Sequence, residues 1–147
     1  TNGLVVYLSS DTAVFGDMKT LISDYHKARL AVINLGPNPG LFQSGAYAIN
    51  DLLKPASVIF THVNEAATEG GKLKANTQTA ALMKQIKAPA YLAISQRTME
   101  FDGRGKCVSG CRNRDREANA AGAAAINRKR LAPRARSFPA SRAYRYA

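Results

Sequence analysis

The chain has 147 residues, of which 46% are apolar, so it is long enough for one domain with a sizeable core and too apolar to be wholly disordered. Its net charge is +11, but residues 1–111 carry eleven basic and eight acidic residues whereas residues 112–147 carry ten and two. The excess positive charge therefore says little about the partners of residues 1–111. No apolar run reaches the roughly 18 residues of a membrane-spanning helix. With no signal peptide recognisable, we expect a cytoplasmic protein without a membrane partner.

Strand and helix patterns alternate from the start of the chain. Gly3 to Leu8 is a short apolar run, typical of a buried strand. Asp17 can act as the N-cap of a helix of about ten residues. The apolar positions of this helix recur at helical spacing and are Met18, Leu21, Ile22 and Tyr25. Leu30 to Leu35 is the next expected strand, and the prolines and glycines of Gly36 to Gly40 indicate a loop after it.

The alternation continues to residue 94. A second helix, with Ala46, Ile49, Leu52 and Leu53 on one face, should end at Lys54 because Pro55 follows. Ser57 to Thr61 is expected to be a strand ending at His62, and Asn64 to Lys74 a polar loop. Asn76 can cap a third helix whose apolar face is Thr79, Leu82, Met83 and Ile86. With a strand over Ala90 to Ile94, the β-α-β-α-β-α-β order predicts an α/β fold with helices packed on a buried sheet.

The regular pattern weakens after Ile94 and is lost after Cys111. We therefore expect a body of residues 1–111 and an Arg- and Ala-rich tail of residues 112–147 that is disordered or translated out of frame. A natural basic arm and an artificial segment are alternatives for this tail. Cys107 and Cys111 are too few for a disulfide framework and lack the second pair that a structural zinc site needs, so we expect ordinary thiols.

Polar side chains follow the expected strands, which is where chemistry gathers in open α/β folds. These candidates are Asp11, Asn34, Asn38, His62, Asn64 and Glu65. Each also has a structural interpretation: Asp11 could cap the turn at Thr12, and His62 could simply end its strand. His26 lies near the end of a helix, where a cationic side chain suits the helix dipole, and we expect it to be structural.

Four segments resemble the metallo-β-lactamase-fold hydrolases, in the branch of ascorbate-6-phosphate lactonase-like and uncharacterised metal-dependent hydrolases. Ser10 to Met18 resembles the G-D-T-x-x-F-x-D-M segment of that branch. Leu30 to Gly36 is similar to its L-L-P-I-G strand, and Ala46 to Pro55 to its A-A-x-A-x-x-L-K-P helix. Val58 to His62 is similar to its V-I-P-x-H strand. The four matches occur in the family's order and extend over about Gly3 to Cys107.

The resemblance implies an αββα sandwich with two metal ions. The family's aspartate and histidine ligands match Asp11 and His62, which would bind zinc, or else manganese or iron. Paired ions can generate a hydroxide nucleophile near neutral pH, so the complete protein would hydrolyse an ester, a lactone or a phosphorylated small molecule. Asn64 and Glu65 directly follow His62 and are expected to contact the substrate, whereas a solvated loop is the alternative.

The family's H-x-H-x-D-H segment, which supplies most metal ligands and the residue that orients the attacking water, is absent. Asp11 and His62 are two ligands where a catalytic zinc needs three, and no catalytic residue can be assigned. We therefore expect this chain to be the carboxy-terminal half of such a hydrolase, beginning within the domain and inactive alone. Its exposed half-domain face should favour self-association.

A non-enzymatic α/β module with a nucleic-acid-binding tail is the alternative function, although we consider nucleic acid an improbable partner. The tail has a basic run, Arg128 to Arg130, which is followed in the sequence by the aromatic residues Phe138 and Tyr144. Such segments can contact phosphates and stack on bases. If the tail binds generic DNA, a salt titration should show affinity that falls steeply with added salt. Binding that is insensitive to salt, or no binding, would exclude this function.

Overall fold

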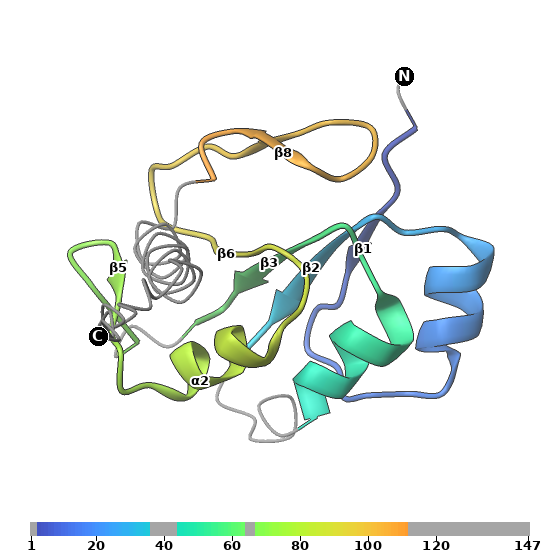
Figure 1. Cartoon of the computed structure of the whole chain (residues 1–147), viewed down its shortest axis with the longest axis horizontal. Helices are drawn as coiled ribbons and strands as arrows, with labels where there is room; N and C mark the ends of the chain where they lie inside the picture. The colour runs from blue at the N-terminus through green and yellow to red at the C-terminus, as the bar shows by residue number, and fades with distance from the viewer. Residues whose placement is uncertain (1–2, 36–43, 64–66, 112–147) are drawn as a thin grey trace, which may run out of the picture. The chain divides into compact units, whose positions relative to one another are not determined.

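The computed structural model describes residues 3–35, 44–63 and 67–111 (Figure 1). Within these ranges a parallel sheet has the order β1 (Val6–Leu8), β2 (Leu30–Asn34), β3 (Ser57–Thr61) and β6 (Ala90–Leu92). The helices η1 (Met18–Tyr25), η2 (Ala48–Leu53) and α2 (Gln78–Gln85) connect these strands. The predicted α/β class with a parallel sheet is thus confirmed, and β2, β3 and β6 lie within one or two residues of their expected bounds.

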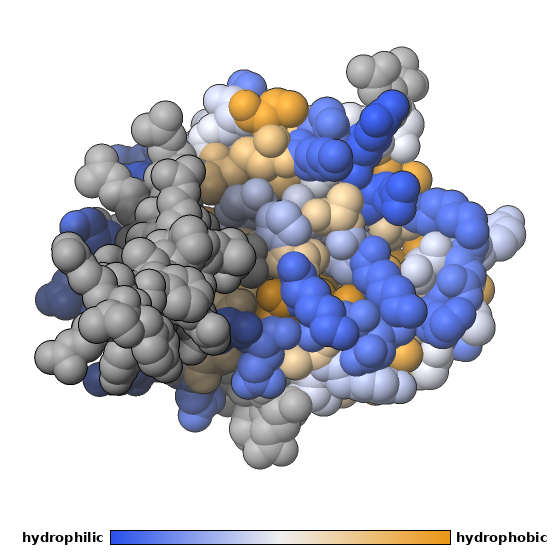
Figure 2. All heavy atoms as spheres, viewed as in Figure 1, coloured by the Kyte–Doolittle hydropathy of each residue, from blue (hydrophilic) through white to orange (hydrophobic). Residues whose placement is uncertain are grey.

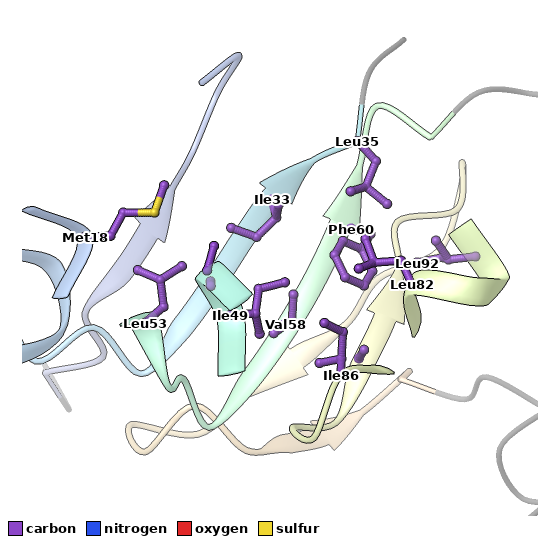
Figure 3. Close-up of a cluster of buried hydrophobic side chains, with 13 residues drawn as sticks. Met18, Ile33, Leu35, Ile49, Leu53, Val58, Phe60, Leu82, Ile86 and Leu92 are labelled. Carbon is purple, nitrogen blue, oxygen red and sulfur yellow. The ribbon is translucent and has the colours of Figure 1, made fainter. Parts of the chain in front are cut away.

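The helices pack on one face of the sheet and form the core with it. Alternate residues of the strands point to this face, so Ile33 of β2 is in register with Phe60 of β3, which in turn is in register with Leu92 of β6. Figure 3 shows the core residues, which are Met18, Ala31, Ile33, Leu35, Ala48, Ile49, Leu53, Val58, Phe60, Leu82, Ile86, Ala90 and Leu92. Of the expected buried face of the third helix, Thr79, Leu82 and Ile86 are buried, with Ile86 directly after α2, and Met83 is partly buried against the core.

The opposite face of the sheet carries a second set of apolar side chains. Leu8, Val32, Ile59 and Tyr91 are in register across the sheet, and we call them the open-face row. The hairpin of β7 (Glu100–Phe101) and β8 (Cys107–Ser109) covers one end of this row, since the ring of Phe101 packs edge-on against Tyr91 at 6.0 Å between centroids. Figure 1 shows this hairpin on the side of the sheet away from α2 and η2. Leu8, at the other end, is 69% exposed.

The expectation that Gly3 to Leu8 is a buried strand is wrong. In the described part of the chain β1 pairs with β2 on one side only and is an edge strand, and Val5, Val6 and Leu8 are all exposed. Tyr7 points to the helical face, where burial raises the pKa of its hydroxyl. On the face viewed in Figure 2, hydrophilic side chains dominate and exposed apolar side chains lie between them.

The helix ends agree with the expected ones in part. Asp17 occupies the N-cap position of η1, as expected, but its side chain accepts no hydrogen bond from the described helix backbone. Leu21 and Tyr25 of the expected buried face are exposed, whereas Met18 is buried and Ile22 packs against the core. The cap of α2 is Thr77, whose hydroxyl accepts a hydrogen bond from the Ala80 N–H at 3.1 Å, and not its neighbour Asn76. The end of η2 agrees with the expectation: Lys54, before Pro55, has left-handed backbone geometry.

Two hairpins, one before α2 and one after β6, add strands to the predicted elements. The expected loop of Asn64 to Lys74 contains β4 (Thr68–Glu69) and β5 (Lys72–Leu73), joined by Gly70 and Gly71. Both glycines have positive φ, as a two-residue hairpin turn requires. In the β7–β8 hairpin, Asp102 Oδ1 accepts hydrogen bonds from the backbone N–H groups of Lys106 and Arg104, which hold the pKa of that carboxyl below its usual value.

The expectation of two ordinary thiols is wrong, because Cys107 and Cys111 form a disulfide. Their Cα atoms lie 6.2 Å apart, within the range that a disulfide bridges. Gly110 lies between them with a φ of +75°, and a Cβ there would collide with the backbone oxygen of Thr98. The tail of residues 112–147 lies outside the described residues, so the expected domain boundary stays a prediction. No helix among the described residues is long and apolar enough to cross a bilayer.

Two leucines test the assignment of the buried face. Leu82 is 2% exposed on the helical face and Leu8 is 69% exposed on the edge strand. Leu82→Ala should lower the free energy of unfolding by about 2–5 kcal/mol, because it leaves a cavity in the core. Leu8→Ala should change it by no more than about 0.5 kcal/mol. Urea denaturation of both variants measures these values, and equal losses would contradict the assignment.

Candidate functional site at the carboxyl edge of the sheet

The polar residues that follow β1, β2 and β3 lie together. Because the strands are parallel, their carboxyl ends meet at one edge of the sheet. This edge holds Asp11 after β1, Asn34 at the end of β2, and Thr61 and His62 at the end of β3. Asn34 and Thr61 are in register with each other and lie on the same face as the open-face row.

A chain of side-chain contacts connects the three strand ends. The Asn34 Nδ2 group donates a hydrogen bond to Asp11 Oδ1 at 3.0 Å. Thr61 Oγ1 donates a short hydrogen bond to Asn34 Oδ1. Asp11 Oδ1 also lies 3.6 Å from His62 Nδ1, which makes an ion pair when the imidazole is protonated. A carboxylate and an imidazole that are 51 residues apart in the sequence thus share one small site.

Ser9 holds the segment after β1 against β2. Its hydroxyl accepts a hydrogen bond from the Asn34 N–H and donates one to the backbone oxygen of Ser10, both at 3.0 Å. Its own N–H donates to Val32 O at 2.9 Å. Neither Ser9 nor Thr61 was among the residues expected from the sequence. The sequence feature that could have indicated either residue is its place at the end of an expected strand, where each supplies a hydroxyl group.

Ser10 and His62 turn the chain shortly after β1 and β3 end. Both have φ of +50°, in the left-handed region that a non-glycine residue rarely adopts. Such a residue costs about 1–2 kcal/mol relative to ordinary geometry. Ser10 occupies the position at which the resembling family has glycine, and its positive φ is the physical reason why glycine suits this turn.

The other predicted site residues have different outcomes. The turn-capping alternative for Asp11 is not what the structure contains, since its carboxylate accepts from Asn34 instead. His26 ends η1 and packs edge-on against Tyr25 at 4.9 Å, and its expected structural role stays a prediction. Asn38, Asn64 and Glu65 lie outside the described residues, so their roles stay predictions.

The donor atoms at this edge suit one side of a metal site. Ligand atoms of a tetrahedral zinc ion lie about 3.3 Å apart, and Asp11 Oδ1 and His62 Nδ1 are separated by 3.6 Å. Both side chains are accessible, with 78% of Asp11 and 56% of His62 exposed. Over the described ranges, however, no three His, Cys, Asp or Glu residues gather in a way that could hold an ion. The pair therefore fits as part of a metal site and not as a complete one.

Comparison with known proteins supports a metal-dependent hydrolase. No family model matches the chain. Part of it is similar to proteins named UPF0173 metal-dependent hydrolase from two strains of Staphylococcus epidermidis, each 35% identical over 63 residues. The match extends over 42% of this chain and 27% of each relative, so the chain spans about a quarter of the length of these relatives. The similarity agrees with the predicted class of protein and does not distinguish the lactonase-like branch.

The strain at Ser10 leads to a prediction for stability. Ser10→Gly should raise the free energy of unfolding by up to about 1 kcal/mol, because glycine adopts positive φ without a steric penalty. The backbone oxygen that accepts from Ser9 is kept in this variant. Ser23→Gly, within η1, is the matched control and should lower the free energy of unfolding by about 0.5 kcal/mol. Urea denaturation measures both, and a destabilised Ser10→Gly variant would contradict the turn geometry.

Proposed function

We propose that this chain is part of a metal-dependent hydrolase with the metallo-β-lactamase fold. The observation that carries the proposal is the approach of the Asp11 carboxylate to the His62 imidazole at the carboxyl edge of a parallel sheet. The partial similarity to UPF0173 metal-dependent hydrolases supports the same class. In its complete form the protein would cleave an ester, a lactone or a phosphorylated small molecule, and the four matching segments favour the ascorbate-6-phosphate lactonase-like branch.

The open face of the sheet supports an αββα sandwich in the complete protein. Leu8, Val32 and Ile59 form an apolar row on this face, and the site of Asp11 and His62 borders the same face through Asn34 and Thr61. A second sheet that packed on this face would bury the row, which is favourable in proportion to the apolar area removed from water. The same second sheet would bring further ligands beside Asp11 and His62.

Asp11 and His62 would hold the metal, and zinc is the ion that this pair favours, with manganese or iron as alternatives. A bound ion would supply a hydroxide near neutral pH and polarise the bond that is cleaved. Asn64 and Glu65 directly follow the strand that ends at His62, so we assign them to substrate contact. Two protein ligands are fewer than a catalytic zinc requires, and the chain alone should therefore be inactive.

Zinc titration of the purified chain tests the metal site. Imidazole NMR signals of His62 should shift as Zn²⁺ is added, and Asp11→Ala should abolish this shift because it removes one of the two ligands. His26→Ala is the matched control and should leave the binding unchanged, since His26 packs against Tyr25 at the end of η1. Equal binding in wild type and Asp11→Ala would contradict the proposed site.

The nucleotide sequence upstream of this reading frame gives an independent test. A metallo-β-lactamase fold requires an H-x-H-x-D-H segment before the part represented here, and this segment should be encoded in frame. If no such segment exists upstream, the assignment to this fold is wrong whatever the zinc titration yields.

A further inference from the structure

We propose that Asn34 is a positioning residue that fixes the Asp11 carboxylate beside His62, and that Thr61 in turn sets the orientation of the Asn34 amide. That Asp11 and His62 bind a metal rests on the proposed function. The positioning of Asp11 by Asn34 does not. The proposal stands on two side-chain hydrogen bonds that link Thr61 to Asn34 and Asn34 to Asp11.

Asp11 needs such a partner because its own segment does not hold it. The residues between β1 and η1 form no regular structure, and 78% of the Asp11 side chain is exposed. An exposed aspartate samples several rotamers, and binding a ligand in one of them has an entropic cost. The hydrogen bond from Asn34 selects one orientation in advance, which is how partners of ligating carboxylates raise metal affinity.

Asn34 is held more firmly than the residue it orients. It ends β2, a central strand, and its backbone N–H donates to the buried Ser9 hydroxyl. Its neighbour in the sheet is Thr61, with which it is in register. The Asn34 side chain therefore connects Asp11, in the segment after β1, to Thr61 at the end of β3.

The chemistry of the groups determines which way the Asn34 amide faces. An ionised carboxylate can only accept, so the amide must direct its NH₂ group to Asp11 Oδ1. Its oxygen then faces Thr61, whose hydroxyl donates to it. The reversed amide would set two acceptor oxygens 3.0 Å apart at Asp11. Loss of the Thr61 hydroxyl leaves the amide oxygen without this donor and weakens the preference for the productive orientation.

A neutral amide suits this task better than a charged donor. Each carboxylate oxygen has two lone pairs, and Asn34 occupies one on Oδ1, leaving acceptor capacity for His62 or a cation. A lysine or arginine at this position would also donate to Asp11, but its positive charge would repel a divalent cation at short range. Asn34 fixes the carboxylate without lowering its attraction for a cation.

Three variants of the full chain test the proposal: Asn34→Leu, Thr61→Val and, as the conservative control, Thr61→Ser. Without metal, the Hα–Hβ couplings of Asp11 should report a single rotamer in wild type and Thr61→Ser. They should become averaged in Asn34→Leu and Thr61→Val. Zinc affinity at His62 should fall about tenfold in the last two variants and be retained in Thr61→Ser. Urea denaturation shows whether each variant remains folded.

The outcomes separate this proposal from the proposed function. A single Asp11 rotamer in folded Asn34→Leu overturns the positioning role, and so does unchanged zinc affinity in that variant. If Asn34→Leu does not fold, the comparison of Thr61→Val with Thr61→Ser decides by the same two measurements. If wild type binds no zinc at His62, the metal site is refuted, and the Asp11 couplings alone support or overturn the role of Asn34.

Discussion

The packing of the helices on a single face of the parallel sheet is the constraint on which the rest of the structure depends. The strands follow one another across the sheet in chain order, and right-handed crossovers then carry every connecting helix over the same face. Residues such as Phe60 and Leu82 make the core there. The other face carries the open-face row, which begins at the exposed Leu8, and the β7–β8 hairpin covers the opposite end of this row.

The candidate site forms where this open face meets the carboxyl edge of the strands. Parallel strands bring Asp11, Asn34 and His62 to one edge although they are distant in the sequence. Left-handed backbone geometry at Ser10 and His62 turns the chain at this edge. Asp11, His62 and Leu8 are all exposed, and a second layer packed here in the proposed complete protein would cover them.

The sequence predicted those elements whose signal is local. The strands β2 and β3 are apolar runs bounded by proline, glycine or polar residues, and the helix before Lys54 ends at a proline. The sequence did not predict that β1 is an edge strand, because an apolar run of residues can form either an edge strand or a central strand of a sheet. Asn76 and Thr77 are both good capping residues, so only backbone geometry distinguishes them. The disulfide of Cys107 likewise depends on a bend that the spacing of the cysteines does not reveal.

By itself the sequence determined the α/β class and placed Asp11 and His62 at the ends of strands, because residue types and periodicity are local properties. That these two residues are metal ligands, and that further ligands are missing, is what the family resemblance implies. Only the tertiary structure decided that these two side chains meet, that Asn34 and Thr61 connect them, and that the site borders the face that carries Leu8, Val32 and Ile59. The physical reason is that hydrogen bonds and packing between residues far apart in the chain depend on the register of neighbouring strands, which no single segment encodes.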